Sequence, residues 1–268
     1  MPFHRFEDYE AKYLSPHLSS GEGPVIEGKY MYFCKVRKEP GTGSQYHYHP
    51  NELMIFPLVG KINAMVGKER KILSPGTFVH VPPYARHSMF ATEDKKMEYL
   101  YVKDHTWTVV GLAADEAPPE EAPTVDEINE RHDTGSWANQ ERDASKSEII
   151  IDGIKNNYYP IIDSLDAPER TGYQQNWIQG ERLSFGFVEM PAGMEESTSI
   201  SEREQFILIL SGSLDAKVDS EEKTVGEGDV IEIPKGSERS LKTSNEGSVR
   251  YASVRSTPQL EKLVDEAN

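Results

Sequence analysis

The chain has 268 residues and a formal net charge of -16, with 37% apolar and 28% charged residues. Such a composition is typical of soluble chains that fold around a core, and it excludes a largely disordered protein. The excess of acidic residues argues against a nucleic-acid partner, because phosphate binding requires clustered Lys and Arg.

Membrane insertion and disulfide bonding are also disfavoured. No apolar run approaches the ~20 residues that span a bilayer, and the first residues lack the apolar core of a signal peptide. The single cysteine, Cys34, excludes an internal disulfide and is typical of proteins from a reducing compartment. We therefore expect a cytoplasmic protein that makes no contact with a membrane.

Short segments rich in Val, Ile, Phe and Tyr follow one another along the chain, separated by turn signals. They are residues 28–38, 52–59, 61–67, 76–83 and 97–103 in the first half, and 183–190, 204–210, 215–220, 229–234 and 249–255 in the second. These residue types are favoured in strands, and the regular spacing predicts β-sandwiches or β-barrels. Helical patterns occur only at 125–133 and 257–268.

Residues 112–147 differ in composition, being rich in Ala, Pro and acidic residues and poor in strand formers. This composition is typical of a connection between domains. We therefore expect an N-terminal barrel over 1–111, a linker over 112–147, and a C-terminal barrel with a final helix over 148–268.

The two halves repeat each other when the sequence is shifted by 152 positions. The matched pairs are Gly41 and Gly193, Gly60 and Gly212, Gly76 and Gly228, and Pro82 and Pro234. Glycine and proline mark turns and strand ends through their backbone limits, so their coincidence predicts matching backbones. The sequence therefore predicts an all-β protein of two tandem barrels.

Three histidines of the first half point to metal chemistry. Residues two apart on a strand point to the same face, so His47 and His49 project together. His87 follows the turn near Pro82 and is the expected third ligand from a facing strand. Imidazole nitrogens bind Fe, Mn, Ni, Cu and Zn, so the three residues predict one metal site. The alternative is a surface pair of histidines with an unrelated third.

The spacing of these residues resembles that of the cupin family. In that family's first motif the glycine, His-x-His and final glycine are matched by Gly41, His47, His49 and Gly60, whereas Leu53 takes the glutamate position. Its second motif is matched by Gly76, Pro82 and His87, with Tyr84 in place of the middle glycine. The resemblance implies a bicupin, with two double-stranded β-helix (jelly-roll) barrels.

The second half resembles the family in its turns and lacks its ligands. Gly193, Gly212, Gly228, Pro234 and Gly236 keep the frame, Gln205 takes the glutamate position, and Ser199, Ser201 and Arg239 stand at the histidine positions. Serine is a poor ligand for transition ions and arginine is cationic. We therefore expect one metal ion per chain, in the first barrel.

A fourth ligand is left open by the sequence. Glu52 is adjacent to the expected glutamate position but has the wrong parity, so it would need a bulge near Pro50 to reach the ion. His80 lies on the strand that leads to His87, where it could coordinate, support a ligand, or belong to the core. Arg86, immediately before His87, is a candidate to bind a substrate carboxylate.

An ion held by three histidines keeps positions open for water, substrate or oxygen, which is typical of catalytic sites. Three-histidine cupins similar to this chain are often dioxygenases, so we expect Fe2+ and cleavage of a carbon–carbon bond in a small oxygenated substrate. Zn2+, Mn2+, Ni2+ and Cu2+ fit the same ligands, and a polyketide cyclase, isomerase or lyase is the redox-neutral alternative. A cupin that only binds a small ligand is the non-enzymatic alternative. Two barrels in one chain allow a monomer as well as a homodimer.

Overall fold

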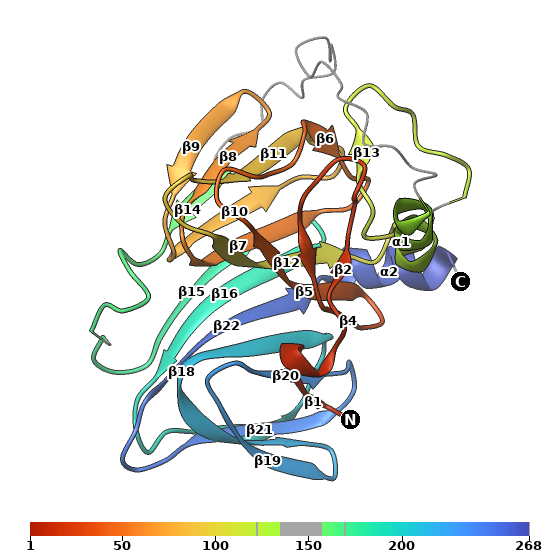
Figure 1. Ribbon diagram of the computed structural model, residues 1–268. Helices are drawn as coiled ribbons and strands as arrows, with labels where there is room; N and C mark the ends of the chain where they lie inside the picture. The colour runs from red at the N-terminus through yellow and green to blue at the C-terminus, as the bar shows by residue number, and fades with distance from the viewer. Residues whose placement is uncertain (122, 135–156, 169, 268) are drawn as a thin grey trace. The chain divides into compact units, whose positions relative to one another are not determined.

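The computed structural model describes residues 1–121, 123–134, 157–168 and 170–267. Antiparallel β-strands dominate it (Figure 1), which confirms the predicted all-β fold. The chain divides into two compact units. The N-terminal barrel unit comprises Glu10–Val25 and Tyr32–Leu165, and the C-terminal barrel unit comprises Met1–Tyr9, Ile26–Met31 and Asp166–Asn268.

Two sheets form the N-terminal barrel unit. The strands are β2 (Lys12–Tyr13), β3 (Glu22–Gly23), β5 (Met31–Lys38), β6 (His47–Tyr48), β7 (Leu53–Val59), β8 (Ile62–Val66), β9 (Glu69–Leu73), β10 (Thr77–Val81), β11 (His87–Ala91), β12 (Met97–Asp104), β13 (Leu112–Ala113) and β14 (Tyr158–Pro160). One sheet runs β14-β10-β7-β12-β5-β3-β2, and the other runs β13-β6-β11-β8-β9. Inward side chains of both sheets, such as Ile55, Val79 and Met89, share one apolar core.

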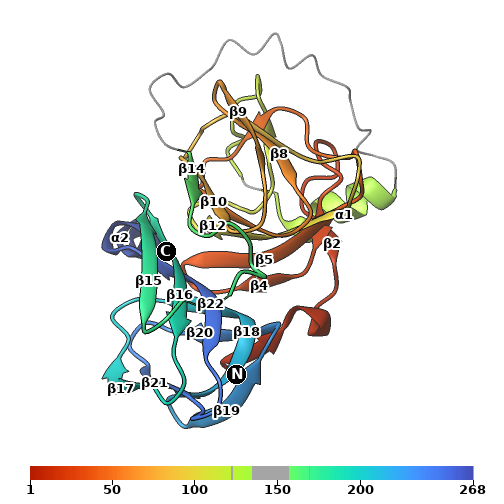
Figure 2. The ribbon, with the colours of Figure 1, turned by 90° about the vertical axis from the view of Figure 1, so that its left-hand side faces the viewer.

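The C-terminal barrel unit is organised around one long strand. Its elements are β1 (Phe3–Arg5), the 3-10 turn η1 (Phe6–Asp8), most of β4 (Val25–Glu27), β15 (Gln174–Gln179), β16 (Leu183–Met190), β17 (Glu195–Ile200), β18 (Gln205–Val218), β19 (Glu221–Gly226), β20 (Asp229–Ile233), β21 (Glu238–Thr243), β22 (Val249–Ser256) and helix α2 (Pro258–Ala267). The first part of β18 pairs with β20 and β22, and its second part with β19 and β21. Figure 2 shows β15, β16 and β22 as neighbouring strands.

Equivalent glycines have equivalent backbones in the two units, as the repeat predicts. Gly60 and Gly212 have φ angles of 72° and 77°. A Cβ atom would lie 2.2 Å from the Lys96 carbonyl oxygen at the first position and 2.1 Å from the Ser248 carbonyl oxygen at the second. Both constraints exclude a side chain, so glycine is required at each position.

The compact units differ in extent from the expected ranges. Strand β1 pairs with β20, and so the first residues of the chain belong to the C-terminal barrel unit. Strand β14 pairs with β10 and belongs to the N-terminal barrel unit. Within the expected linker, β13 pairs with β6, and helix α1 (Val125–Asp133) begins with a capping box at Thr124. The rest of that linker from 135 on, and the expected start of the second barrel at 148–156, lie outside the described residues.

Candidate metal centre

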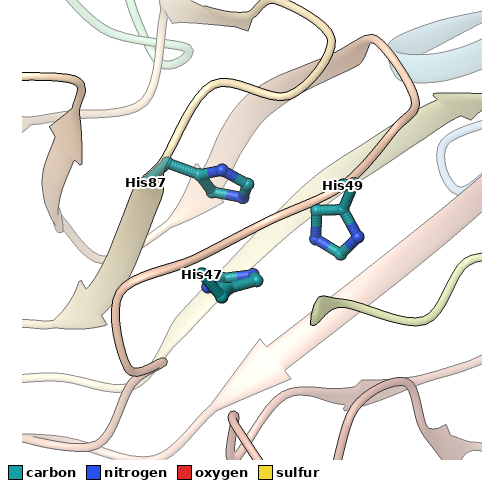
Figure 3. Close-up of side chains that lie close together, drawn as sticks. All are labelled: His47, His49 and His87. Atoms are coloured by element: carbon teal, nitrogen blue, oxygen red, sulfur yellow. The ribbon is translucent and has the colours of Figure 1, made fainter. Parts of the chain in front are cut away.

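Backbone pairing brings the three predicted ligands together. On β6 and β11, His47 and His87 are directly opposite each other, and His49 comes directly after the end of β6. All three side chains are buried. One nitrogen from each ring lies within 4.8 Å of those of the other two, and Figure 3 shows the rings around a common space.

Hydrogen bonds fix the orientation of the imidazole rings. The Nδ1 atom of His47 lies 2.7 Å from the Gln45 carbonyl oxygen, and that of His87 lies 2.9 Å from the Ala85 carbonyl oxygen. A carbonyl only accepts, so each Nδ1 carries the proton and each Nε2 keeps a free lone pair. This is the tautomer that a metal-binding imidazole needs when its other nitrogen donates to the protein.

Burial keeps the three imidazoles neutral. It lowers the pKa of His87 to about 3, and it lowers the pKa values of His47 and His49 well below 6.5. The positive charges that the neighbouring rings would carry, and those of nearby lysines, act in the same direction. Neutral imidazole is the form that coordinates metals, so the three rings fit a divalent transition ion.

Two residues beside His49 were missed by the sequence argument. The Nζ atom of Lys103 lies 2.5 Å from His49 Nδ1 and donates to the Val109 carbonyl oxygen at 2.6 Å. The Tyr101 hydroxyl lies 3.3 Å from His49 Nε2. Both residues are on β12, and their spacing of two was the available signal for a shared inward face. Burial lowers the pKa of Lys103 well below 10.5, and His49 Nδ1 also lies 3.1 Å from the Val110 carbonyl oxygen.

Glycine at position 111 gives the rings their space. A Cβ atom there would lie 2.8 Å from Cδ2 of His47 and 2.9 Å from Cε1 of His49. The Gly111 amide also donates to the Ser15 hydroxyl oxygen at 2.7 Å. Any side chain at this position would push the histidines out of place. No periodicity or motif in the sequence signals this role.

The two candidates for a fourth ligand contact each other instead of the histidine group. His80 Nε2 and Glu52 Oε1 lie 2.7 Å apart, and neither residue belongs to the group of three. The backbone amide of Glu52 donates to the Asp104 carboxylate, which fixes this part of the chain. Leu53, at the motif's glutamate position, is completely buried in the apolar core.

The Arg86 side chain contacts other residues of the protein. Its guanidinium donates to the carbonyl oxygens of Ala114 and Tyr84 and lies 4.0 Å from the centre of the Tyr48 ring. Burial lowers its pKa, because the charged form is stabilised less than in water. The side chain therefore connects the turn before β11 to the chain after β13.

A small cavity adjoins the histidines. It has about 30 Å³ of room for the centres of water molecules, and its walls include His47, His87, Lys38, Ser44 and Tyr101. One water needs roughly 10–15 Å³ by this measure, so the cavity can hold a ligand of a few non-hydrogen atoms. The arrangement thus places a small cavity, lined by both apolar and polar side chains, beside His47 and His87 of the histidine group.

The corresponding region of the C-terminal barrel unit has different contacts. Arg239 donates to the Glu196 carboxylate at 2.7 Å, and Ser199 is its partner across the strands. The Ser201 hydroxyl donates to the Arg203 carbonyl oxygen at 2.7 Å. Among the described residues, this unit contributes no group of three metal-binding side chains.

Known proteins share this fold and its duplication. The cupin domain family matches residues 35–103 and 186–255, together just over half of the chain, so the chain belongs to the cupin family. This confirms the predicted bicupin. No curated protein sequence matches the chain. Within the described residues, no helix is long and apolar enough to cross a membrane.

Solved structures similar to this one are bicupins at low sequence identity. Oxalate decarboxylase from Bacillus subtilis is 14% identical with a TM-score of 0.66, over 95% of this chain and 76% of that one. Lactobacillus farciminis oxalate decarboxylase in its formate complex is 13% identical with a TM-score of 0.67, over 96% and 86%. AerE from Microcystis aeruginosa is 13% identical with a TM-score of 0.62, over 96% and 100%. Similarity at this level shows the fold.

Proposed function

We propose that the N-terminal barrel unit is the catalytic part of a metal-dependent enzyme that cleaves a carbon–carbon bond in a small oxygenated molecule, with dioxygen as cosubstrate. The observation that carries this proposal is the group of three buried histidines, two of which, His47 and His87, line the small cavity. His47, His49 and His87 would hold one divalent ion, with Fe2+ as the first expectation. When bound, such an ion supplies Lewis-acid and oxygen-binding chemistry.

The protein residues bind and orient the substrate in this proposal. Because the three ligands are neutral, they leave the charge of a bound ion uncompensated, which favours an anionic or chelating substrate. The Tyr101 hydroxyl, next to His49, is placed to donate a hydrogen bond to a substrate oxygen. The apolar core around the cavity limits the access of bulk water.

A redox-neutral cleavage is the second candidate function. The oxalate decarboxylases among the similar structures favour it, and one of them is described with Mn(II) centres. Such a reaction also breaks a carbon–carbon bond, but it needs no net oxidation. This chain has Leu53 where the family's first motif has a glutamate, so its ion would have one protein ligand fewer.

Metal analysis combined with oxygen uptake tests both candidates. The purified protein is assayed for metals and then supplied with diketones, hydroxyketones and small carboxylic acids, under air and under nitrogen. Bound iron and substrate-dependent oxygen uptake would support the dioxygenase, and turnover of one of these compounds under nitrogen would support the redox-neutral enzyme. A protein that binds no transition metal would contradict both candidate functions. The His47→Ala variant serves as the inactive control.

We also propose that the protein is cytoplasmic, and that it acts on a small molecule as a monomer or a homodimer. Cys34 is the one cysteine of the chain and is buried, so no internal disulfide can form, which supports a reducing compartment. Sedimentation analysis separates the two oligomeric states.

A further inference from the structure

Lys38 is a buried lysine that has no anionic partner in the described structure. It is the last residue of β5, and its exposed fraction is 3%. Its one hydrogen bond within the described residues runs from Nζ to the Met89 carbonyl oxygen at 2.9 Å. No carboxylate of the described chain forms an ion pair with it, and burial lowers its pKa to about 7.

An unpaired buried ammonium is costly, so its position calls for a reason. Burying a charge without a partner is unfavourable, because the ammonium group loses its hydration and gains nothing in return. An apolar residue would fill the same space without that cost. The neighbouring chain leaves room for the lysine, because Gly21 has no side chain and a Cβ atom there would lie 3.0 Å from Lys38 Cε.

The ammonium group and the histidines share one cavity. Lys38 borders the cavity together with His47, His87, Ser44 and Tyr101. An ammonium group has three N–H donors, and the Met89 carbonyl accepts one of them. The other donors can reach a ligand in the cavity. The positive charge of Lys38 also lowers the pKa values of His47 and His87, which shows that the three groups are close.

We infer that Lys38 binds a carboxylate of the substrate, so that the substrate of this site is a small carboxylic acid. The acid would be held between the ammonium group of Lys38 and an ion on the three histidines. Lys38 thereby takes the role that the sequence suggested for Arg86, whose guanidinium is bonded to backbone carbonyls. This inference rests on the proposed function, which places the ion on the three histidines.

Oxalate binding to a Lys38→Met variant tests the inference. The full-length protein is titrated with oxalate by calorimetry, both loaded with Mn2+ and after treatment with a chelator. Oxamide, which has a similar shape and no charge, is the parallel probe. Loss of a charge-assisted hydrogen bond should weaken oxalate binding by about 10- to 100-fold, while oxamide binding and metal content stay as in the unmodified protein.

Two controls keep the outcome clear. Lys61→Met removes an exposed lysine of the same unit and should change nothing. Lys38→Gln is a second variant if Lys38→Met folds poorly by circular dichroism. Oxalate that binds equally well to the unmodified protein and the folded Lys38 variants, or that binds to neither, would overturn the inference. If the unmodified protein binds no metal, that result contradicts the proposed function and leaves the inference about Lys38 testable. The titration of chelator-treated protein still compares oxalate binding between the unmodified protein and the Lys38 variants.

Discussion

Gly111 shows how a single residue without a functional group can determine the metal centre. The Gly111→Ala change would place a methyl group against both His47 and His49, which are held by their own hydrogen bonds. We expect metal affinity to fall by about 10- to 100-fold, as when the supporting partners of ligands are removed. Competition with a coloured chelator measures this affinity.

The matched control for this substitution is Gly247→Ala. A Cβ atom there has the Ser244 hydroxyl oxygen, 3.6 Å away, as its nearest neighbour, so the change should leave metal affinity unaltered. Equal affinities for the Gly111→Ala and unmodified proteins would show that the rings have more freedom than their contacts indicate.

The buried histidines also make the metal-free protein sensitive to acid. An unfolded histidine binds its proton near pH 6.5, whereas folded His87 binds it near pH 3. Between these values the unfolded state holds more protons, so the free energy of unfolding falls as the pH falls. At pH 5 the contribution of His87 amounts to a loss of about 2 kcal/mol.

Urea unfolding of chelator-treated protein at pH 7.5 and pH 5 measures this loss. A His87→Gln variant, which cannot titrate, should lose less stability over the same interval. Parallel losses in the two proteins would assign the acid sensitivity to other groups.

At the scale of elements, strand β1 should stabilise the C-terminal barrel unit, although it comes first in the sequence. Phe3–Arg5 pair with β20, and Arg5 and Asp229 form an ion pair at 2.7 Å. Deleting residues 1–9 removes these bonds and leaves β20 with an unpaired edge. We expect faster hydrogen exchange in the β20 amides that bond to β1.

Strand β7 provides the internal reference for this experiment. It pairs with β10 and β12, and the deletion touches neither of them. Its exchange rates should therefore stay unchanged. Unchanged exchange in β20 as well would mean that β1 contributes little to the stability of its sheet.

At the scale of the whole molecule, the two units should differ in metal binding. The N-terminal barrel unit has the three histidines, whereas Arg239 and Glu196 form an ion pair in the C-terminal barrel unit. We expect one metal equivalent per chain by elemental analysis. His87→Ala should remove the metal without loss of the β signal in circular dichroism, and Arg239→Ala should retain it. Two equivalents per chain, or retention of metal by His87→Ala, would contradict this assignment.

The amino-acid sequence by itself determined the duplication and the class of fold. It also identified the three histidines that the structure brings together. Glycines such as Gly60 and Gly212 are needed where the backbone has a positive φ angle, so they mark the same turns in both halves. Strand alternation likewise placed His47 and His49 on one face. These features depend on local geometry, which a short stretch of sequence can specify.

The tertiary structure decided which residues surround the histidines. His80 and Glu52 bond to each other, and Arg86 bonds to backbone carbonyls, because strand pairing fixes partners that are far apart in sequence. The same pairing brings Lys38 to the cavity and Gly111 to the rings. Such contacts depend on register and packing across sheets, and the alternation within each strand carries no information about them.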